Sequence, residues 1–172
     1  MHLLKDKTVY LCGSMNLKKD SGIEWREEIT PKLLEYGLTV LDPCKKTVTN
    51  ACEIGEDKKE FRRLILEEKW NELKERFWPV VRNDLRACDK SDLIIFNYEP
   101  EISTVGSVHE LVVANYEKKV ILLKYDKAQL DKFNPWICVF IKNHHFFSEW
   151  SDMFAYLREV DNGKMDTSLW VM

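Results

Sequence analysis

The sequence alternates short, almost wholly apolar runs with longer segments of helical periodicity, and this alternation limits the possible folds more than any other feature. Strands that are buried on both faces of a parallel sheet have this continuous apolar character. Because helical segments separate the runs, the pattern predicts an α/β fold with a central, mostly parallel sheet of five strands. Four runs are clear and a fifth is a candidate: residues 8–12, 38–41, 93–96, 120–123 and 137–141.

Helices are expected between and after these runs. The first begins at a capping-box pattern formed by Ser21 and Glu24 and stops near Gly37. Pro31 interrupts it, so either the helix kinks there or a second short helix begins with Thr30 as its cap. The other expected helices are 57–77, which is the longest, 111–118 and 148–160.

Length and composition indicate a single globular domain over residues 1–172. With 26 Lys and Arg against 29 Asp and Glu, the net charge is −3, so the surface as a whole attracts neither nucleic acid nor an anionic membrane. The longest apolar run, residues 136–141, is far shorter than the roughly 20 residues that cross a bilayer, and the sequence shows no signal peptide. We therefore expect no nucleic-acid polymer and no membrane among the partners.

The five cysteines are odd in number and form no C-x-x-C pair, so neither a zinc ribbon nor a thioredoxin-type site is expected. This usage is typical of reduced thiols, and we expect a cytoplasmic protein. Only four histidines are present, which gives metal chemistry little support. The sequence therefore predicts no metal site and no other cofactor.

In open parallel sheets, ligands bind beyond the carboxyl ends of the strands, so the residues after each run are the first candidates for a site. Gly13 and Ser14 follow the first run. A glycine there allows the backbone to approach a ligand, and a serine can donate to a phosphate or sugar oxygen. A plain turn is the simpler interpretation, since neither G-x-G-x-x-G nor a P-loop motif is present.

Residues 97–110, after the third run, are the most informative part of the sequence. A turn of small residues, 103–107, leads into a helix whose first turn is expected to hold His109 and Glu110. Hydroxyl groups and free backbone N–H groups at a helix start can bind an anion, and Glu110 would face the same crevice. Taken alone, Glu110 is more simply explained as complementing the helix dipole, and His109 is more typical of a packing or surface residue.

Three separated motifs occur in a familiar order and spacing. They are VYLCGS at residues 9–14, DL at 84–85 followed by CDxxDLII at 88–95, and TVGSVHEL at 104–111. Together they resemble the nucleoside 2-deoxyribosyltransferase family and its relatives, the 2'-deoxynucleoside 5'-monophosphate N-glycosidases. The resemblance covers roughly residues 8–124. Without it, position alone does not make Asp84 catalytic.

The resemblance implies a flavodoxin-like three-layer sandwich that cleaves the N-glycosidic bond of a (deoxy)nucleoside or its 5'-monophosphate with retention. Glu110 matches the family's nucleophile, Asp84 the acid that helps the nucleobase leave, and Tyr10 the tyrosine that hydrogen-bonds the glutamate. Asp42, which ends the second run, either contacts the base or forms a turn. The expected substrate-binding residues are Gly13, Ser14, Asp42, Ser103, Thr104, Gly106 and Ser107.

The chain departs from the family pattern around its third motif. Val108 stands in place of a frequent glycine, His109 is atypical, and Asn16 stands where the monophosphate-cleaving relatives often have an arginine. Thr104 is neutral where the deoxyribosyltransferases favour an acid for the free 5'-hydroxyl, and a carboxylate would repel a 5'-phosphate. The neutral Thr104 favours a nucleotide over a nucleoside.

Members of the family complete their sites with residues of a neighbouring subunit, so the resemblance implies a homodimer or a higher homo-oligomer. The aromatic-rich segment 134–172 lies outside the resemblance and either supplies such a contact or packs on its own chain. The sugar passes either to water or to a free nucleobase acceptor. The alternative to an enzyme is a non-catalytic nucleotide-binding module on the same fold.

Overall fold

Five parallel strands form one sheet in the computed structural model, which describes residues 2–45, 52–167 and 170. The strand order is β2-β1-β3-β4-β5, so that β1 pairs with both β2 and β3. The strands are β1 Thr8–Gly13, β2 Thr39–Leu41, β3 Leu93–Asn97, β4 Val120–Lys124 and β5 Phe146–Phe147. The predicted α/β class with a flavodoxin-like sheet is confirmed.

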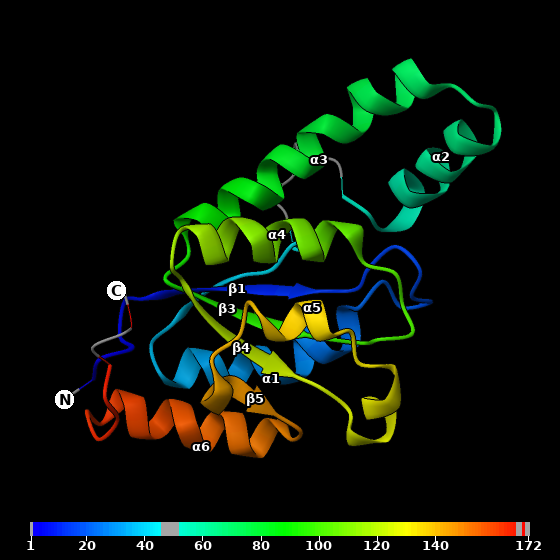
Figure 1. Cartoon of the computed structure of the whole chain (residues 1–172). Coiled ribbons are helices and arrows are strands. Elements are labelled where there is room, and N and C mark those ends of the chain that lie inside the picture. Colours follow the sequence, from blue (N-terminus) through cyan, green and yellow to red (C-terminus); the bar gives the residue numbers. More distant parts are fainter. Residues whose placement is uncertain (1, 46–51, 168–169, 171–172) are drawn as a thin grey trace.

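Helices cover both faces of this sheet and complete three layers (Figure 1). Successive residues of a strand point to opposite faces. Val9 and Leu11 of β1 pack with α1 and α6, whereas Tyr10 and Cys12 pack with α3, α4 and α5. The helices are α1 Ile23–Glu35, α2 Gly55–Leu66, α3 Trp70–Lys90, α4 Val105–Tyr116, α5 Pro135–Cys138 and α6 Trp150–Asp161.

The single long helix predicted for residues 57–77 is wrong, because the chain forms the separate helices α2 and α3 there (Figure 1). Helix α2 ends where Glu68 adopts a left-handed φ of 56° and the Lys69 N–H donates to the Leu64 carbonyl at 2.9 Å. This bond belongs to a Schellman motif, which usually has glycine at the left-handed position. A glutamate there gives no stop signal in the sequence.

Helix α3 continues through Pro79 to Lys90, well beyond the predicted end. Proline removes one helical hydrogen bond, but burial of the inner face offsets this loss. That face carries Val80, Asp84 and Cys88 at four-residue spacing, and all three are buried. The extension places Asp84 inside a helix rather than at the end of one.

The capping box predicted at the start of α1 is wrong. The cap residue is Gly22, with a φ of 71°, and it has no side chain that could form a cap hydrogen bond. The carboxylate of Asp20 instead accepts the N–H of Glu24 at 3.2 Å. Helix α1 runs through Pro31 as one element, so a second short helix does not form there.

The fifth strand is Phe146–Phe147, and the strand predicted at residues 137–141 is wrong because the chain forms α5 there. Pro135 occupies the first position of this helix, and the Asn134 side chain accepts the Trp136 N–H at 3.0 Å. The short turns η1 Lys127–Lys132 and η2 Asn143–His145 flank it. Strand β5 extends the sheet and α6 covers it, so residues 146–161 pack on their own chain. No helix within the described residues is long and apolar enough to cross a membrane.

Candidate active site

A cavity of about 380 Å³ opens beside the end of β1 and the loop after β3, where α3 faces the start of α4. This volume lies in the range of small-molecule sites. Helix α4 begins at Val105 rather than at residue 111, so Glu110 lies in its second turn. The predicted site residues that line the cavity are Tyr10, Gly13, Asp84, Ser103, Thr104, Gly106, Ser107 and Glu110.

Two side chains of β1 hold the Glu110 carboxylate. The Tyr10 hydroxyl donates to Oε1 at 2.9 Å, and the Cys12 thiol donates to Oε2 at 3.0 Å. Tyr10 and Cys12 are two residues apart on the strand and therefore point to the same face of the sheet. Each carboxylate oxygen thus has its own donor, and the two bonds set the plane of the group at the cavity wall.

Burial raises the pKa of Glu110 to about 7. The Cys12 hydrogen bond lowers this pKa, the charge of Asp84 raises it further, and the Tyr10 hydrogen bond lowers it. Loss of water and a like charge disfavour the carboxylate, whereas hydrogen-bond donors favour it. Burial also raises the pKa of both Tyr10 and Cys12, so both groups retain the proton that they donate. At neutral pH, Glu110 is therefore divided between its carboxylate and its protonated form.

Asp84 reaches the same cavity from α3. It lies on the buried inner face of this helix and is 8% exposed. Its charge raises the pKa of both Glu110 and Tyr10, so the two carboxyl groups lie within electrostatic reach of each other. Two carboxyl groups at one cavity allow one to act as the nucleophile while the other supplies a proton.

The start of α4 presents polar groups to the cavity. Ser103, Thr104 and Ser107 are among the residues that line this end of the cavity. The Thr104 hydroxyl oxygen is buried and has no hydrogen-bond partner in the described part of the chain. The first N–H groups of a helix also lack helical partners and favour an anion. This end of the cavity therefore suits a sugar hydroxyl or a phosphate.

Gly13 and Ser14 serve the packing at the end of β1. A Cβ at Gly13 would lie 3.0 Å from the ring of Trp25 and 3.1 Å from the carbonyl oxygen of Asn97. Ser14 is 1% exposed and is not among the residues that line the cavity. The close contact at Gly13 explains why a glycine stands here even though no phosphate-loop motif follows.

Asp42 does not line the cavity but borders an adjoining hollow with Tyr10 and Asp84. Its Oδ1 accepts the N–H of Cys44 at 2.8 Å, which is the turn that the sequence left open as the other interpretation. Its side chain is only 5% exposed. The structure therefore brings neither Ser14 nor Asp42 to the wall that Glu110 shares.

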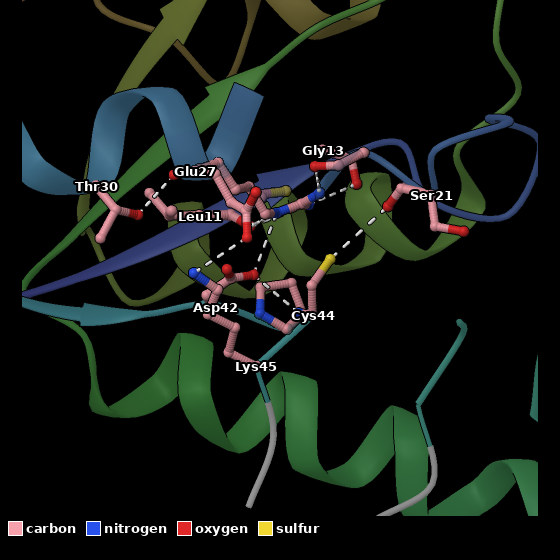
Figure 2. A network of polar contacts seen from close by, with 12 residues as sticks. Leu11, Gly13, Ser21, Glu27, Thr30, Asp42, Cys44 and Lys45 are labelled. Carbon is pink, nitrogen blue, oxygen red and sulfur yellow. Dashed lines mark hydrogen bonds and ion pairs between the residues drawn. The ribbon is translucent and has the colours of Figure 1, made fainter. Parts of the chain in front are cut away.

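A buried arginine faces Asp42. Arg26 Nε lies 3.6 Å from Asp42 Oδ1, and both side chains are almost completely buried. The guanidinium also donates to the carbonyl oxygens of Leu11, Gly13 and Gly22 at distances between 2.7 and 3.2 Å (Figure 2). A buried charge needs such partners to offset its lost hydration. The network ties the end of β1 to the start of α1.

Sequence reasoning missed Cys12 and Arg26. Cys12 stands two residues after Tyr10 in a predicted strand, so the shared face was a usable signal. Arg26 precedes Ile29 and Leu33 by three and seven residues and so occupies the buried face of α1. Within residues 2–45, 52–167 and 170, no three His, Cys, Asp or Glu side chains are placed to hold a metal ion.

Solved structures match this chain over most of its length. A 2-deoxyribosyltransferase from the psychrotolerant bacterium Bacillus psychrosaccharolyticus is 18% identical, with a TM-score of 0.56 and coverage of 87% of this chain and 95% of that chain. The chain shares the deoxyribosyltransferase fold. A conserved protein from Enterococcus faecalis V583 is 14% identical, with a TM-score of 0.62 and coverage of 90% and 99%. No protein-family model and no curated protein matches the sequence, so this likeness concerns the fold.

Proposed function

We propose that this protein cleaves the N-glycosidic bond of a (deoxy)nucleoside or its 5'-monophosphate through a glycosyl ester of Glu110. The observation that carries this proposal is the oriented carboxylate, which accepts one hydrogen bond from Tyr10 and one from Cys12 at a cavity that Asp84 also lines. A carboxylate with little water around it and a set orientation is suited to attack a carbon centre. The likeness to a 2-deoxyribosyltransferase structure supports the same class of chemistry.

The reaction has two displacements. The ionised Glu110 attacks the anomeric carbon, so that a carbon–oxygen bond forms while the bond from this carbon to the base nitrogen breaks. Glu110 and Asp84 share one proton near neutral pH, and the reactive form is the one in which Asp84 holds it. The electron pair of the broken bond goes to the base, which takes this proton from Asp84 and leaves neutral. Water or a second nucleobase then attacks the same carbon, its proton returns to Asp84, and the ester bond breaks to release Glu110. Two inversions at one carbon give net retention.

The cavity walls support a nucleoside or nucleotide as the substrate. Phe77, Val80, Val81 and Leu85 of α3 form an apolar wall that suits the flat face of a base. The hydroxyls near the start of α4 suit the sugar and its 5'-substituent. Because Thr104 is neutral, this end of the cavity accepts a 5'-phosphate without repulsion, and we favour the monophosphate as the substrate.

A direct assay of the wild-type protein tests the proposed function. Nucleosides, deoxynucleosides and their 5'-monophosphates are each incubated with the protein, with and without a second free base, and the products are separated by liquid chromatography. Free base from at least one substrate is expected, and a swapped product that requires the second base would identify transfer. Nucleotide binding without base release from any substrate would identify a binding module and overturn the proposal.

Replacing Thr104 by aspartate is expected to shift the preference from the monophosphate toward the free nucleoside. The added carboxylate repels a 5'-phosphate but can accept a hydrogen bond from a 5'-hydroxyl, and we expect the ratio of the two kcat/KM values to change about 10-fold or more. Thr104→Ser keeps the hydroxyl and serves as the control. An unchanged ratio in the aspartate variant would exclude a role for Thr104 at the 5' end.

A further inference from the structure

The Cys12 thiol has an unusual position for a buried cysteine. The side chain is completely buried, and Sγ lies 3.0 Å from Glu110 Oε2 but 3.7 Å from the carbonyl oxygen of Ser107. The shorter contact marks the carboxylate as the main acceptor of the thiol proton. Tyr10 already holds the other oxygen of the same carboxylate. The donor to Oε2 is therefore a thiol, although a serine hydroxyl at the same position would also donate a hydrogen bond.

We propose that Cys12 is a positioning residue, a weak donor that orients Oε2 of Glu110 while leaving the carboxylate reactive. This inference rests on the proposed function of Glu110. A thiol is a weaker donor than a hydroxyl. A strong donor would stabilise the carboxylate before the reaction, whereas the negative charge disappears as the glycosyl ester forms. A weak donor therefore sets the geometry with less loss of nucleophilicity.

The other titratable and charged groups around Glu110 come from β1, α1, α3, α4 and the segment before α2. They are Tyr10, Arg26, Glu53, Asp84, Cys88 and His109. Cys88 donates to the main-chain carbonyl of Glu110 at 3.5 Å, so its thiol and that of Cys12 touch different parts of one residue. Substitutions at Cys12 leave all six groups in the protein, and a change in the titration of Glu110 then reports the thiol itself.

The test compares Cys12→Ala and Cys12→Ser with the wild type in the acid limb of the pH profile of kcat/KM. Removing the donor in Cys12→Ala should raise the midpoint by about 0.5 to 1 pH unit, and the stronger donor in Cys12→Ser should lower it by a similar amount. The plateau value of kcat should fall about 3- to 10-fold in both variants with little change in KM. In Cys12→Ala, kcat falls because the Glu110 carboxylate is less well oriented. In Cys12→Ser, kcat falls because the stronger donor stabilises the carboxylate before it reacts.

A titration of Glu110 without substrate independently tests the expected order of the midpoints in the three proteins. Protein labelled with ¹³C at the glutamate carboxyl is titrated by NMR, and the Glu110 signal is assigned by its absence in Glu110→Gln. The midpoint should decrease from Cys12→Ala to wild type to Cys12→Ser. Circular dichroism shows whether each variant is folded, and Cys12→Ser, which differs from the wild type by a single atom, keeps the test usable if the alanine variant is unstable.

Cys88→Ala is the matched control, because it removes a buried thiol that contacts the main chain of Glu110 instead of the carboxylate. Its midpoint should equal that of the wild type. Equal midpoints in all four proteins, or shifts in the same direction for Cys12→Ala and Cys12→Ser, would make Cys12 a packing residue and overturn the inference. Normal turnover by Glu110→Ala would refute the proposed function itself, so the two failures are distinguishable.

Discussion

Glu110→Ala should abolish base release, with kcat/KM falling by at least about 10³-fold, because the variant lacks the group that forms the bond to the sugar. The measurement is the chromatographic assay, with the substrate that the wild-type protein cleaves fastest. The side chain faces the cavity instead of filling the apolar core, so the fold should survive the change. Circular dichroism and thermal unfolding establish that the loss is chemical.

Glu110→Gln separates the charge of this residue from its shape. In the folded protein the pKa of Glu110 rises from its ordinary value of 4.5 to about 7, so the folded state binds this proton more tightly than the unfolded state. Ionisation of Glu110 therefore destabilises the fold as the pH rises from about 4.5 to about 7. The glutamine variant should be inactive, yet it should melt at a higher temperature than the wild type at pH 8 and at the same temperature at pH 4. An active glutamine variant would contradict the nucleophilic role.

Asp84→Asn should lower kcat by about 10²- to 10⁴-fold with little effect on KM, because an amide cannot supply the proton that the leaving base takes. A nucleotide with a 7-methylated purine carries a cationic base that leaves without this proton. The variant should therefore cleave the methylated substrate at nearly the wild-type rate. Steady-state kinetics with the two substrates measures both effects.

The contrast between the two substrates is the decisive part of that experiment. A structural defect in Asp84→Asn would slow both substrates equally, whereas loss of a proton donor slows only the unmodified one. Unchanged kcat with a raised KM would instead identify Asp84 as a ligand contact. Asp89 lies five residues further along the same helix and does not line the cavity, so Asp89→Asn serves as the matched control.

The fold class was predictable because short, almost wholly apolar runs form strands that must be covered by helices on both faces of a sheet. Residues 8–12, 93–96 and 120–123 form β1, β3 and β4 with small differences at their ends. The run at 137–141 was misassigned because periodicity cannot distinguish a short buried strand from a short buried helix. The actual fifth strand has only two residues, which is too short for a recognisable pattern.

The candidate site was less accessible to sequence reasoning. Tyr10, Asp84 and Glu110 lie far apart in the chain, and only the resemblance joined them before the structure was known. Their convergence depends on the pairing of β1 with β3 and on the path of α3 across the sheet, which no local pattern encodes. The pairing of Arg26 with Asp42 is likewise a contact between α1 and the end of β2. The geometry brings these groups together, and their catalytic roles stay predictions.

Different elements hold Glu110 and form the apolar wall of the cavity, and this arrangement affects which substitutions the fold can accept. The groups that hold Glu110 come from a strand bonded to neighbours on both sides, whereas the apolar wall of the cavity comes from a helix whose far end projects from the body with α2 (Figure 1). Under the proposed function, exchanges at Phe77 or Val81 should alter which ring is accepted, while the groups of β1 that hold Glu110 stay in place. We therefore expect base selectivity to be open to directed evolution as long as Asp84, which α3 also carries, is kept.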